Sequence, residues 1–305
     1  MLPPLIFAAL VSAPVFLSVE EVIERLNDDS TSMMILDART DDQTNIYLPK
    51  SIKIDWRDFL ENRTPTVLNL WAIHRNSKIS TKPERIVSQL SELGLHPEDN
   101  ILVYGNGDRG FGEEARVWWM LKYFGFQNVA VLDGGIARWR SQGLLVERNR
   151  KKSNRPSVLQ EKWTLSSSFR ITLSELRIKT RKRKTSILDT RSYDEYMGKT
   201  PYFSKRGGRI PRAKHLFWKR LMNDDSTVLS RKAVDKILRD LEITRDSEII
   251  TYCTGGVRSA FVHAVLVHYG YSNVRNYDGS WWEWSQDESL PVELGNVRPD
   301  SRLSK

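Results

Sequence analysis

Short apolar runs alternate along the chain with longer segments in which apolar residues recur every three or four positions. The short runs are typical of buried strands, and the longer segments are typical of amphipathic helices. Strands are predicted at 15–17, 34–37, 101–104, 129–132, 186–189, 248–252 and 274–277. Helices are predicted at 18–27, 82–93, 113–124, 172–180, 230–241 and 259–269. This alternation predicts an α/β fold in which parallel sheets carry helices on both faces.

Three short segments occur twice in the same order. The pairs are Leu36-Asp37 with Leu188-Asp189, Tyr104-Gly105 with Tyr252-Cys253, and Asp133-Gly134 with Asp278-Gly279. Their two copies lie 152, 148 and 145 residues apart, so loop lengths alone change the spacing. A repeat of this length indicates a duplicated domain rather than a solenoid. We therefore expect tandem domains at 15–146 and 169–294, joined by a polar, basic linker at 147–168.

Cys253 is the only cysteine of the chain. It follows the predicted strand 248–252 and precedes Gly255, Gly256 and Arg258, after which a helix is expected. The thiol should thus lie in a tight loop at the carboxyl end of a strand, where ligands bind to parallel sheets. Loop amides and the helix dipole lower a thiol pKa and stabilise an anion beside it. The alternative is an inert buried cysteine, and the glycines and arginine argue against it.

The length of the loop that follows Cys253 limits the reactions that its thiol is suited to. Four residues separate Cys253 from Arg258, whereas cysteine phosphatases use a loop one residue longer. The tighter loop suits a terminal sulfur carried on the cysteine. The segment 252–259 resembles the active loop of rhodanese-type sulfurtransferases, the thiosulfate and 3-mercaptopyruvate sulfurtransferases. The resemblance extends over about 15–294, through Leu-Asp-x-Arg in each copy, Glu195-Tyr-x-Gly and the segment 208–213.

The resemblance implies that the second copy is catalytic and the first is degenerate, since Gly105 occupies the cysteine position of the first copy. It also implies a persulfide on Cys253, formed from a small anionic donor such as thiosulfate or 3-mercaptopyruvate. A second nucleophile, either cyanide, a thiol or a protein, then takes the sulfur. We expect the anionic sulfur to be cradled by backbone amides of Thr254, Gly255, Gly256, Val257, Arg258 and Ser259. Arg258 could instead brace the loop.

One position departs from the family pattern. Glu195 stands where the thiosulfate and mercaptopyruvate enzymes have an anion-binding arginine. We expect nearby basic residues to replace the lost charge, namely Lys199, Lys205, Arg206 and Arg209. Asp189 and Arg191 are expected to fix loops around the pocket or, less favoured, to contact substrate. The tryptophans 281, 282 and 284 are expected to pack in the core or a domain interface rather than against a ligand.

Composition excludes several other classes. The 47 basic and 38 acidic residues give a net charge of +9, which favours anionic substrates and does not by itself imply nucleic acid. The basic stretches 148–155 and 179–184 contain no aromatic residues, so we predict solvated segments and no nucleic-acid binding. A single cysteine excludes an internal disulfide. The five histidines lack metal-ligand spacing, so we expect no metal and no other cofactor.

The first 13 residues are apolar but begin with no basic residue and are interrupted by Pro3-Pro4. We favour an uncleaved extension of a cytoplasmic monomer that binds no membrane; an exported or periplasmic protein is the alternative. Three functions remain open. They are a sulfurtransferase, a sulfur carrier that hands sulfur to a partner without turnover, and a cysteine phosphatase or arsenate reductase, which the short loop disfavours.

Overall fold

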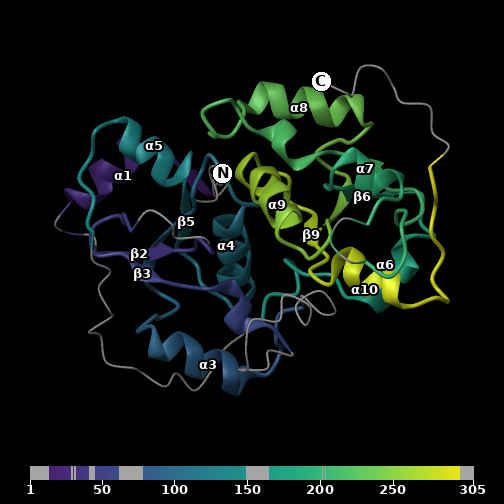
Figure 1. Cartoon of the computed structure of the whole chain (residues 1–305), viewed down its shortest axis with the longest axis horizontal. Helices are drawn as coiled ribbons and strands as arrows, with labels where there is room; N and C mark the ends of the chain where they lie inside the picture. The colour runs from purple at the N-terminus through teal and green to yellow at the C-terminus, as the bar shows by residue number, and fades with distance from the viewer. Residues whose placement is uncertain are drawn as a thin grey trace, which may run out of the picture.

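The computed structural model describes residues 14–28, 30, 32–40, 45–61, 78–148, 165–200, 202 and 204–295. Within these ranges the chain forms two parallel sheets, each with its own helices (Figure 1). The first sheet has the strand order β1-β5-β4-β2-β3, and the second has the order β7-β6-β8-β9. The predicted pair of α/β domains is therefore confirmed. Residues 1–13 and most of the predicted linker, 149–164, lie outside the described residues.

The helices and strands follow the predicted order closely. The first domain contains β1 (Phe16–Leu17), α1 (Val19–Leu26), β2 (Met33–Asp37), β3 (Ile52–Lys53), the 3-10 helix η1 (Trp56–Phe59), α3 (Pro83–Glu92), β4 (Asn100–Tyr104), α4 (Glu113–Tyr123), β5 (Val129–Leu132) and α5 (Gly135–Ser141). The second contains α6 (Leu173–Lys179), β6 (Thr185–Asp189), α7 (Tyr193–Met197), β7 (Lys214–His215), the 3-10 helix η2 (Trp218–Leu221), α8 (Arg231–Asp240), β8 (Glu248–Tyr252), α9 (Arg258–His268), β9 (Val274–Asn276) and α10 (Ser280–Gln286). Every predicted element is present and ends within one residue of its predicted bounds. The sequence did not predict β3, β7, α5, α7 and α10.

Side chains fix where several helices begin. At the start of α1, the Ser18 hydroxyl accepts from the Glu21 amide, and the Glu21 carboxylate accepts from the Ser18 amide. Such capping boxes satisfy two backbone donors that a helix leaves unpaired. The same exchange opens α7, between Ser192 and Glu195. Glu195 is therefore held in place by the local fold as well as by the site described below.

The internal repeat occupies equivalent places in the two sheets. Asp37 pairs with Tyr104 between β2 and β4, and Asp189 pairs with Tyr252 between β6 and β8. Gly105 and Cys253 therefore leave equivalent strands at the same edge of their sheets. This register confirms that the repeated motifs mark two copies of one domain.

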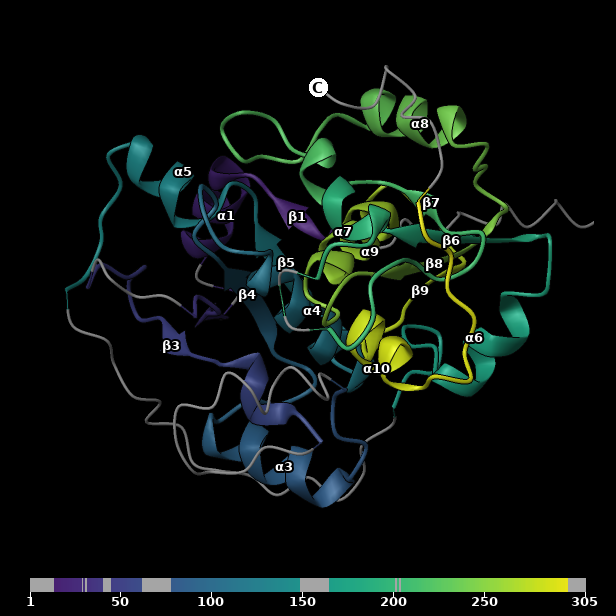
Figure 2. The same ribbon diagram turned by 45° about the vertical axis from the view of Figure 1, so that its right-hand side comes forward.

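Two buried helices, one from each domain, pack against each other between the sheets. α4 and α9 lie side by side at the centre of the molecule (Figures 1 and 2). Rings from both domains meet there: Phe16 contacts Phe261 edge to face at 5.8 Å, and Trp118 contacts His263 at 5.8 Å. A helix that is apolar on all sides is stable only when other parts of the protein bury every one of its faces. Among the described residues, no helix has the length and apolarity needed to cross a membrane.

Candidate active site

Cys253 lies in the loop between β8 and α9, as the sequence predicted, and is 1% exposed. Its sulfur accepts a hydrogen bond from the Gly256 amide at 3.1 Å. Its own amide donates to the hydroxyl of Ser280 at 3.1 Å, and the Ser280 hydroxyl donates to the carbonyl of Tyr277. Ser280 has a φ of 52°, which a non-glycine residue rarely adopts. The backbone of Cys253 is thus held by a strained serine that the sequence did not single out.

The thiol of Cys253 is poised to ionise. Burial raises the pKa of Cys253, but the Arg258 guanidinium, the Ser259 amide and hydroxyl, and the Gly255 amide together lower it below the ordinary value. A cation and convergent donors favour the thiolate over the thiol. The side chain therefore has the electrostatic setting of a nucleophile rather than that of an inert core cysteine.

The two glycines of the loop leave room for its neighbours. Gly256 has a φ of +78°, and a Cβ there would lie 2.6 Å from the guanidinium of Arg116 and 2.6 Å from the carbonyl of Asp278. A Cβ on Gly255 would lie 2.3 Å from the ring of Trp282. Neither position can carry a side chain without displacing these groups. The tight loop consequently depends on both glycines.

Behind the loop, Arg258 forms a buried ion pair with Glu195. Its guanidinium donates to the two carboxylate oxygens at 2.7 and 2.9 Å, and the Thr254 hydroxyl donates to the same carboxylate at 2.5 Å. Burial opposes ionisation of Glu195, but these donors lower its pKa to about 2. They also raise the pKa of Arg258 against the effect of burial. Glu195 thus neutralises the loop arginine, and its effect on donor binding stays a prediction.

The basic residues expected to compensate are engaged elsewhere. Arg206 donates to backbone carbonyls at the end of α10 and beyond it, those of Trp284, Ser285, Asp287 and Leu290. Arg209 lies over the ring of Tyr196 at 4.4 Å and pairs with Glu293 at 3.3 Å. Lys199 and Lys205 form exposed pairs with Asp194 and Glu288. None of these four is among the described residues that line the cavity at Cys253, and their part in donor binding stays a prediction.

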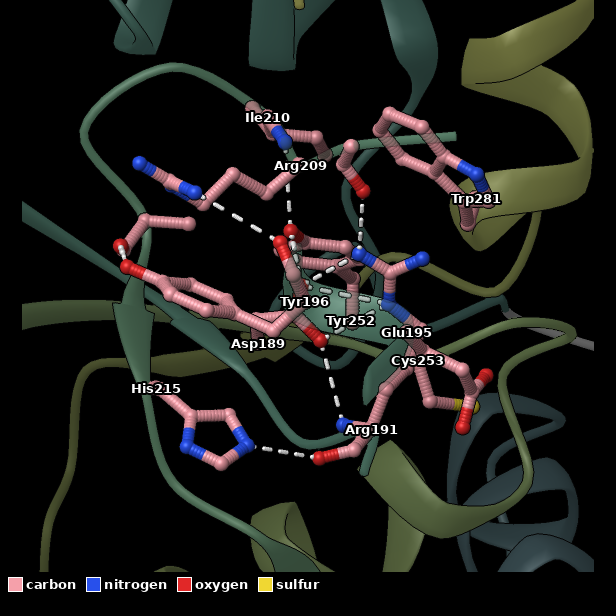
Figure 3. A network of polar contacts seen from close by, with 12 residues as sticks. Asp189, Arg191, Glu195, Tyr196, Arg209, Ile210, His215, Tyr252, Cys253 and Trp281 are labelled. Atoms are coloured by element: carbon pink, nitrogen blue, oxygen red, sulfur yellow. Dashed lines mark hydrogen bonds and ion pairs between the residues drawn. The ribbon is translucent and has the colours of Figure 1, made fainter. Parts of the chain in front are cut away.

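Asp189 and Arg191 form a buried network beneath the loop (Figure 3). Arg191 also donates to the carbonyl of Gly208 at 2.7 Å, and the Tyr252 hydroxyl donates to Asp189 at 2.5 Å. His215 donates from Nε2 to the carbonyl of Arg191 at 2.8 Å. Neither Asp189 nor Arg191 is among the described residues that line the cavity, and their hydrogen bonds connect β6 to β8 and to the segment at Gly208. In the first copy, Asp37 and Arg39 form the equivalent pair.

A cavity of about 300 Å³ opens beside Cys253 between the two domains. Its lining from the first domain is Thr40, Trp56, Arg57, Phe111 and Glu113, and from the second it is Tyr202, Thr254, Gly255, Val257, Arg258 and Trp282. The residues from the first domain are scattered along the sequence, and no local motif identifies them. Tertiary packing brings them to the thiol. Trp281 and Trp284 pack in the core as expected, whereas Trp282 lines the cavity.

The first domain also places a cation under the loop. Arg116, on α4, is fully buried and donates to the carbonyl of Gly256 at 3.1 Å. Its guanidinium lies 4.7 Å from the ring centre of Trp119. Burial lowers the pKa of Arg116 to about 10, and Asp278 and the Cys253 thiolate oppose that shift. Arg116 is charged at neutral pH and favours the thiolate.

The equivalent position of the first domain is filled by a carboxyl group. A Cβ on Gly105 would lie 1.9 Å from Oε2 of Glu114. Burial and the neighbouring Glu113 raise the pKa of Glu114 to about 7. The first copy therefore has no thiol at this position, and the Glu114 carboxyl occupies the place that a side chain there would take. In the part of the chain that the structure describes, no group of three or more His, Cys, Asp or Glu side chains could hold a metal ion.

Comparisons with known proteins agree with this geometry. The family model of the rhodanese-like domain matches residues 18–142 and again 172–287. The chain is 28% identical to the sulfur carrier protein TtuD of Thermus thermophilus, over 92% of this chain and 97% of that protein. It is 30% identical to a putative thiosulfate sulfurtransferase of Mycobacterium tuberculosis, over 84% of this chain and 90% of that protein.

The fold has solved counterparts. The anaerobic ergothioneine biosynthesis enzyme from Chlorobium limicola, in complex with trimethyl histidine, superposes with a TM-score of 0.79 at 20% identity, over 93% of this chain and 71% of that chain. YnjE superposes with a TM-score of 0.74 at 24% identity, over 89% of this chain and 64% of that chain. At this identity the likeness concerns the fold.

Proposed function

Because the chain belongs to the rhodanese-like family, we propose that it moves a sulfane sulfur from a donor to a nucleophilic acceptor through a persulfide on Cys253. The observation that carries the proposal is a thiol of lowered pKa, held by loop amides at the base of a cavity. The named relatives support sulfur handling, since they are putative thiosulfate sulfurtransferases and a sulfur carrier protein.

In the first step, the Cys253 thiolate attacks the outer sulfur of the donor. The bond between the outer sulfur and the rest of the donor breaks, and its electron pair leaves with the remainder, which is sulfite when the donor is thiosulfate. Cys253 keeps the outer sulfur as a persulfide anion. The loop amides and Arg258 are placed to stabilise that anion, in the manner of an oxyanion hole.

In the second step, the acceptor attacks the terminal sulfur and the thiolate of Cys253 leaves. The same groups that lower the thiol pKa make the thiolate a good leaving group. Cyanide, a small thiol or a protein thiol can each serve as acceptor in this chemistry. A carrier that passes sulfur only to a partner protein is the second candidate, because one relative is named a sulfur carrier protein.

Intact-mass measurement tests the proposal. After incubation with thiosulfate or 3-mercaptopyruvate, the protein should gain one sulfur atom, and cyanide should remove it as thiocyanate. Cys253→Ser, which keeps the size of the side chain, should gain nothing. Retention of the sulfur in cyanide and small thiols would favour the carrier. A gain on the Cys253→Ser variant, or no gain with any sulfane donor, would refute the persulfide.

A further inference from the structure

The carboxylate of Asp278 connects the two domains beside the thiol loop. Its Oδ2 accepts a hydrogen bond from the Ile79 amide of the first domain at 2.8 Å, and its Oδ1 accepts from Nε of Arg170 at 2.9 Å. The carboxylate is buried. The backbone of Asp278 packs against Gly256, since a Cβ on Gly256 would lie 2.6 Å from the Asp278 carbonyl oxygen. Because the Gly256 amide donates to the sulfur of Cys253, Asp278 contacts a residue that holds the sulfur.

The carbonyl of Gly256 is held by two further buried side chains. The Asn276 amide group donates to it at 3.2 Å, and the Arg116 guanidinium of the first domain donates to it at 3.1 Å. Burial lowers the pKa of Arg116, the Asp278 carboxylate opposes that effect, and the Arg170 guanidinium adds to it. Two arginines and one carboxylate are thus packed together beside the loop.

The first copy makes the same cross-domain contact in the reverse direction. Its Asp133 accepts a hydrogen bond from the Val228 amide of the second domain at 2.9 Å. Ile79 and Val228 occupy equivalent places, because each pairs with the residue that follows a 3-10 helix, Leu60 in the first domain and Met222 in the second. The two copies therefore exchange one hydrogen bond each across the domain boundary.

The surroundings of these two aspartates differ. Three polar side chains around the thiol loop have apolar counterparts around the equivalent loop of the first copy: Arg170 has Phe16, Asn276 has Val131, and Arg116 has Phe261. Arg170 pairs with Asn276 between strands as Phe16 pairs with Val131, and α4 and α9 are equally long, with Arg116 and Phe261 each the fourth residue. Buried polar groups cost free energy, and the first copy shows that the fold does not need them at these places. Their presence around the thiol alone indicates a role in its chemistry.

The other charged groups near the loop have partners of their own. The pairs are Lys78 with Glu283 at 3.0 Å, Arg57 with Asp55 at 2.5 Å, and Arg258 with Glu195 at 2.7 Å. Glu113 of the cavity wall accepts from the Phe111 amide, and Arg177 is exposed, so that water screens its charge. Burial raises the pKa of Tyr277 well above its ordinary value, so this neighbour of Asp278 stays neutral.

We propose that Asp278 and Arg170 are positioning residues of the sulfur-transfer site, which hold Gly256 against the sulfur and set how strongly Arg116 attracts it. The bearing on sulfur transfer rests on the proposed function, whereas the bearing on the thiol rests on the geometry. Asp278 and the Cys253 thiolate are two negative groups near one guanidinium, so each weakens the attraction of Arg116 for the other. Arg170 pairs with the carboxylate and offsets part of its charge. Removing the carboxylate should therefore make the thiol more acidic, and removing Arg170 should make it less acidic.

Alkylation of Cys253 measures the ionisation of the thiol without a sulfur donor. Cys253 is the only cysteine, so the mass gained from iodoacetamide reports this thiol alone. In Asp278→Asn, the midpoint of the alkylation rate against pH should fall by about half a pH unit, because a negative charge near the thiolate is gone. A merely loosened loop would raise the midpoint, since the amides and Arg258, which favour the thiolate, would be displaced. The direction of the shift thus separates the proposed role from a structural one, and the pH profile of sulfur gain from thiosulfate should follow it.

Variants of the partner and of the equivalent aspartate complete the test. Arg170→Met should raise the midpoint, and Arg170→Lys, which keeps the charge, should return it most of the way; these two variants decide alone if Asp278→Asn does not fold. Asp133→Asn is the matched control, because it makes the same chemical change in the equivalent cross-domain contact and should leave the midpoint unchanged.

The inference and the proposed function fail in different ways. A midpoint that rises or stays in Asp278→Asn, an equal shift in Asp133→Asn, or a shift in Arg170→Lys as large as in Arg170→Met would overturn the inference and leave the persulfide chemistry intact. No sulfur gain in the unmodified protein with any sulfane donor would instead overturn the proposed function, and the alkylation midpoints would still decide how Asp278 and Arg170 act on the thiol.

Discussion

Replacing Glu195 by glutamine perturbs the buried ion pair behind the active loop. Glu195 is 3% exposed and Arg258 is 5% exposed. Glutamine keeps the shape of the side chain but converts one acceptor oxygen into a donor, which then faces the donors of Arg258 or Ser192. The substitution therefore leaves a buried guanidinium without its counter-charge.

The expected loss of stability follows from the pKa of the carboxyl. The pKa falls from the ordinary value of 4.5 to about 2 in the folded protein. That difference corresponds to about 3 kcal/mol of stabilisation of the charged form. Breaking a buried pair by removing one partner typically costs about 3–5 kcal/mol, which agrees. We expect the free energy of unfolding of Glu195→Gln to be lower by about 3 kcal/mol at pH 7.

The pH dependence follows from the sign of the shift. Because folding lowers the pKa of Glu195, its stabilisation is fully present above the ordinary pKa of 4.5 and is lost as the pH falls toward about 2. The difference between the unmodified protein and Glu195→Gln should therefore be constant from pH 7 to about pH 5.5. It should shrink steadily below that pH.

Urea unfolding followed by tryptophan fluorescence measures the effect. The matched control is Glu288→Gln, which removes an exposed partner of Lys205 by the same chemical change and should leave the midpoint unchanged. Adding Arg258→Met to Glu195→Gln should recover part of the loss, because the lone buried charge is gone. Equal midpoints for Glu195→Gln and the unmodified protein at pH 7, or a difference in the free energy of unfolding that is as large at pH 3 as at pH 7, would refute this account.

Two further predictions concern the first domain. Arg116→Met removes a buried cation that favours the Cys253 thiolate, so the pH profile of persulfide formation should move upward by about one pH unit. Arg116→Lys keeps the positive charge and should return the profile most of the way to that of the unmodified protein. An unmoved profile in Arg116→Met would leave Arg116 with a packing role alone. Gly105→Ala should lower the melting temperature, because the Cβ of the new alanine meets the side chain of Glu114. Adding Glu114→Ala should bring the melting temperature back up. A Gly105→Ala protein as stable as the unmodified protein would show that the Glu114 carboxyl does not fill the space at residue 105.

Most of the elements that the sequence predicted are long enough to show apolar periodicity, as in α1 and α8. β3 and β7 have two residues each, too few to show any period, and α7 has five. These short elements form because neighbouring strands and loops contact them. Such contacts cannot be predicted from a local sequence pattern.

The candidate site likewise has a part that the sequence predicted and a part that it did not. The loop around Cys253 is contiguous, so its glycines, arginine and spacing could be interpreted together. The ion pair of Glu195 was not predicted, because its partner, Arg258, lies 63 residues away in the chain. From the residues next to it in the sequence, the carboxylate suggests a change in the charge that binds the sulfur donor. In the folded chain it neutralises an arginine. Phe111 and Arg116 reach the loop through helix packing, for which the sequence holds no local signal.

The duplicated architecture separates the parts of the site between its copies. The second domain supplies the proposed nucleophile and the loop amides, and the first supplies the buried cation Arg116 and the cavity residues Trp56 and Phe111. Gly105 carries no thiol, so the first domain has no counterpart of the proposed nucleophile. Since α9 carries the thiol loop on one end and packs against α4 along its length, any displacement between the domains changes the loop and the cavity together. Under the proposed function, the copy without a thiol therefore serves to complete the site of the other copy, through Arg116 and the cavity residues that it supplies.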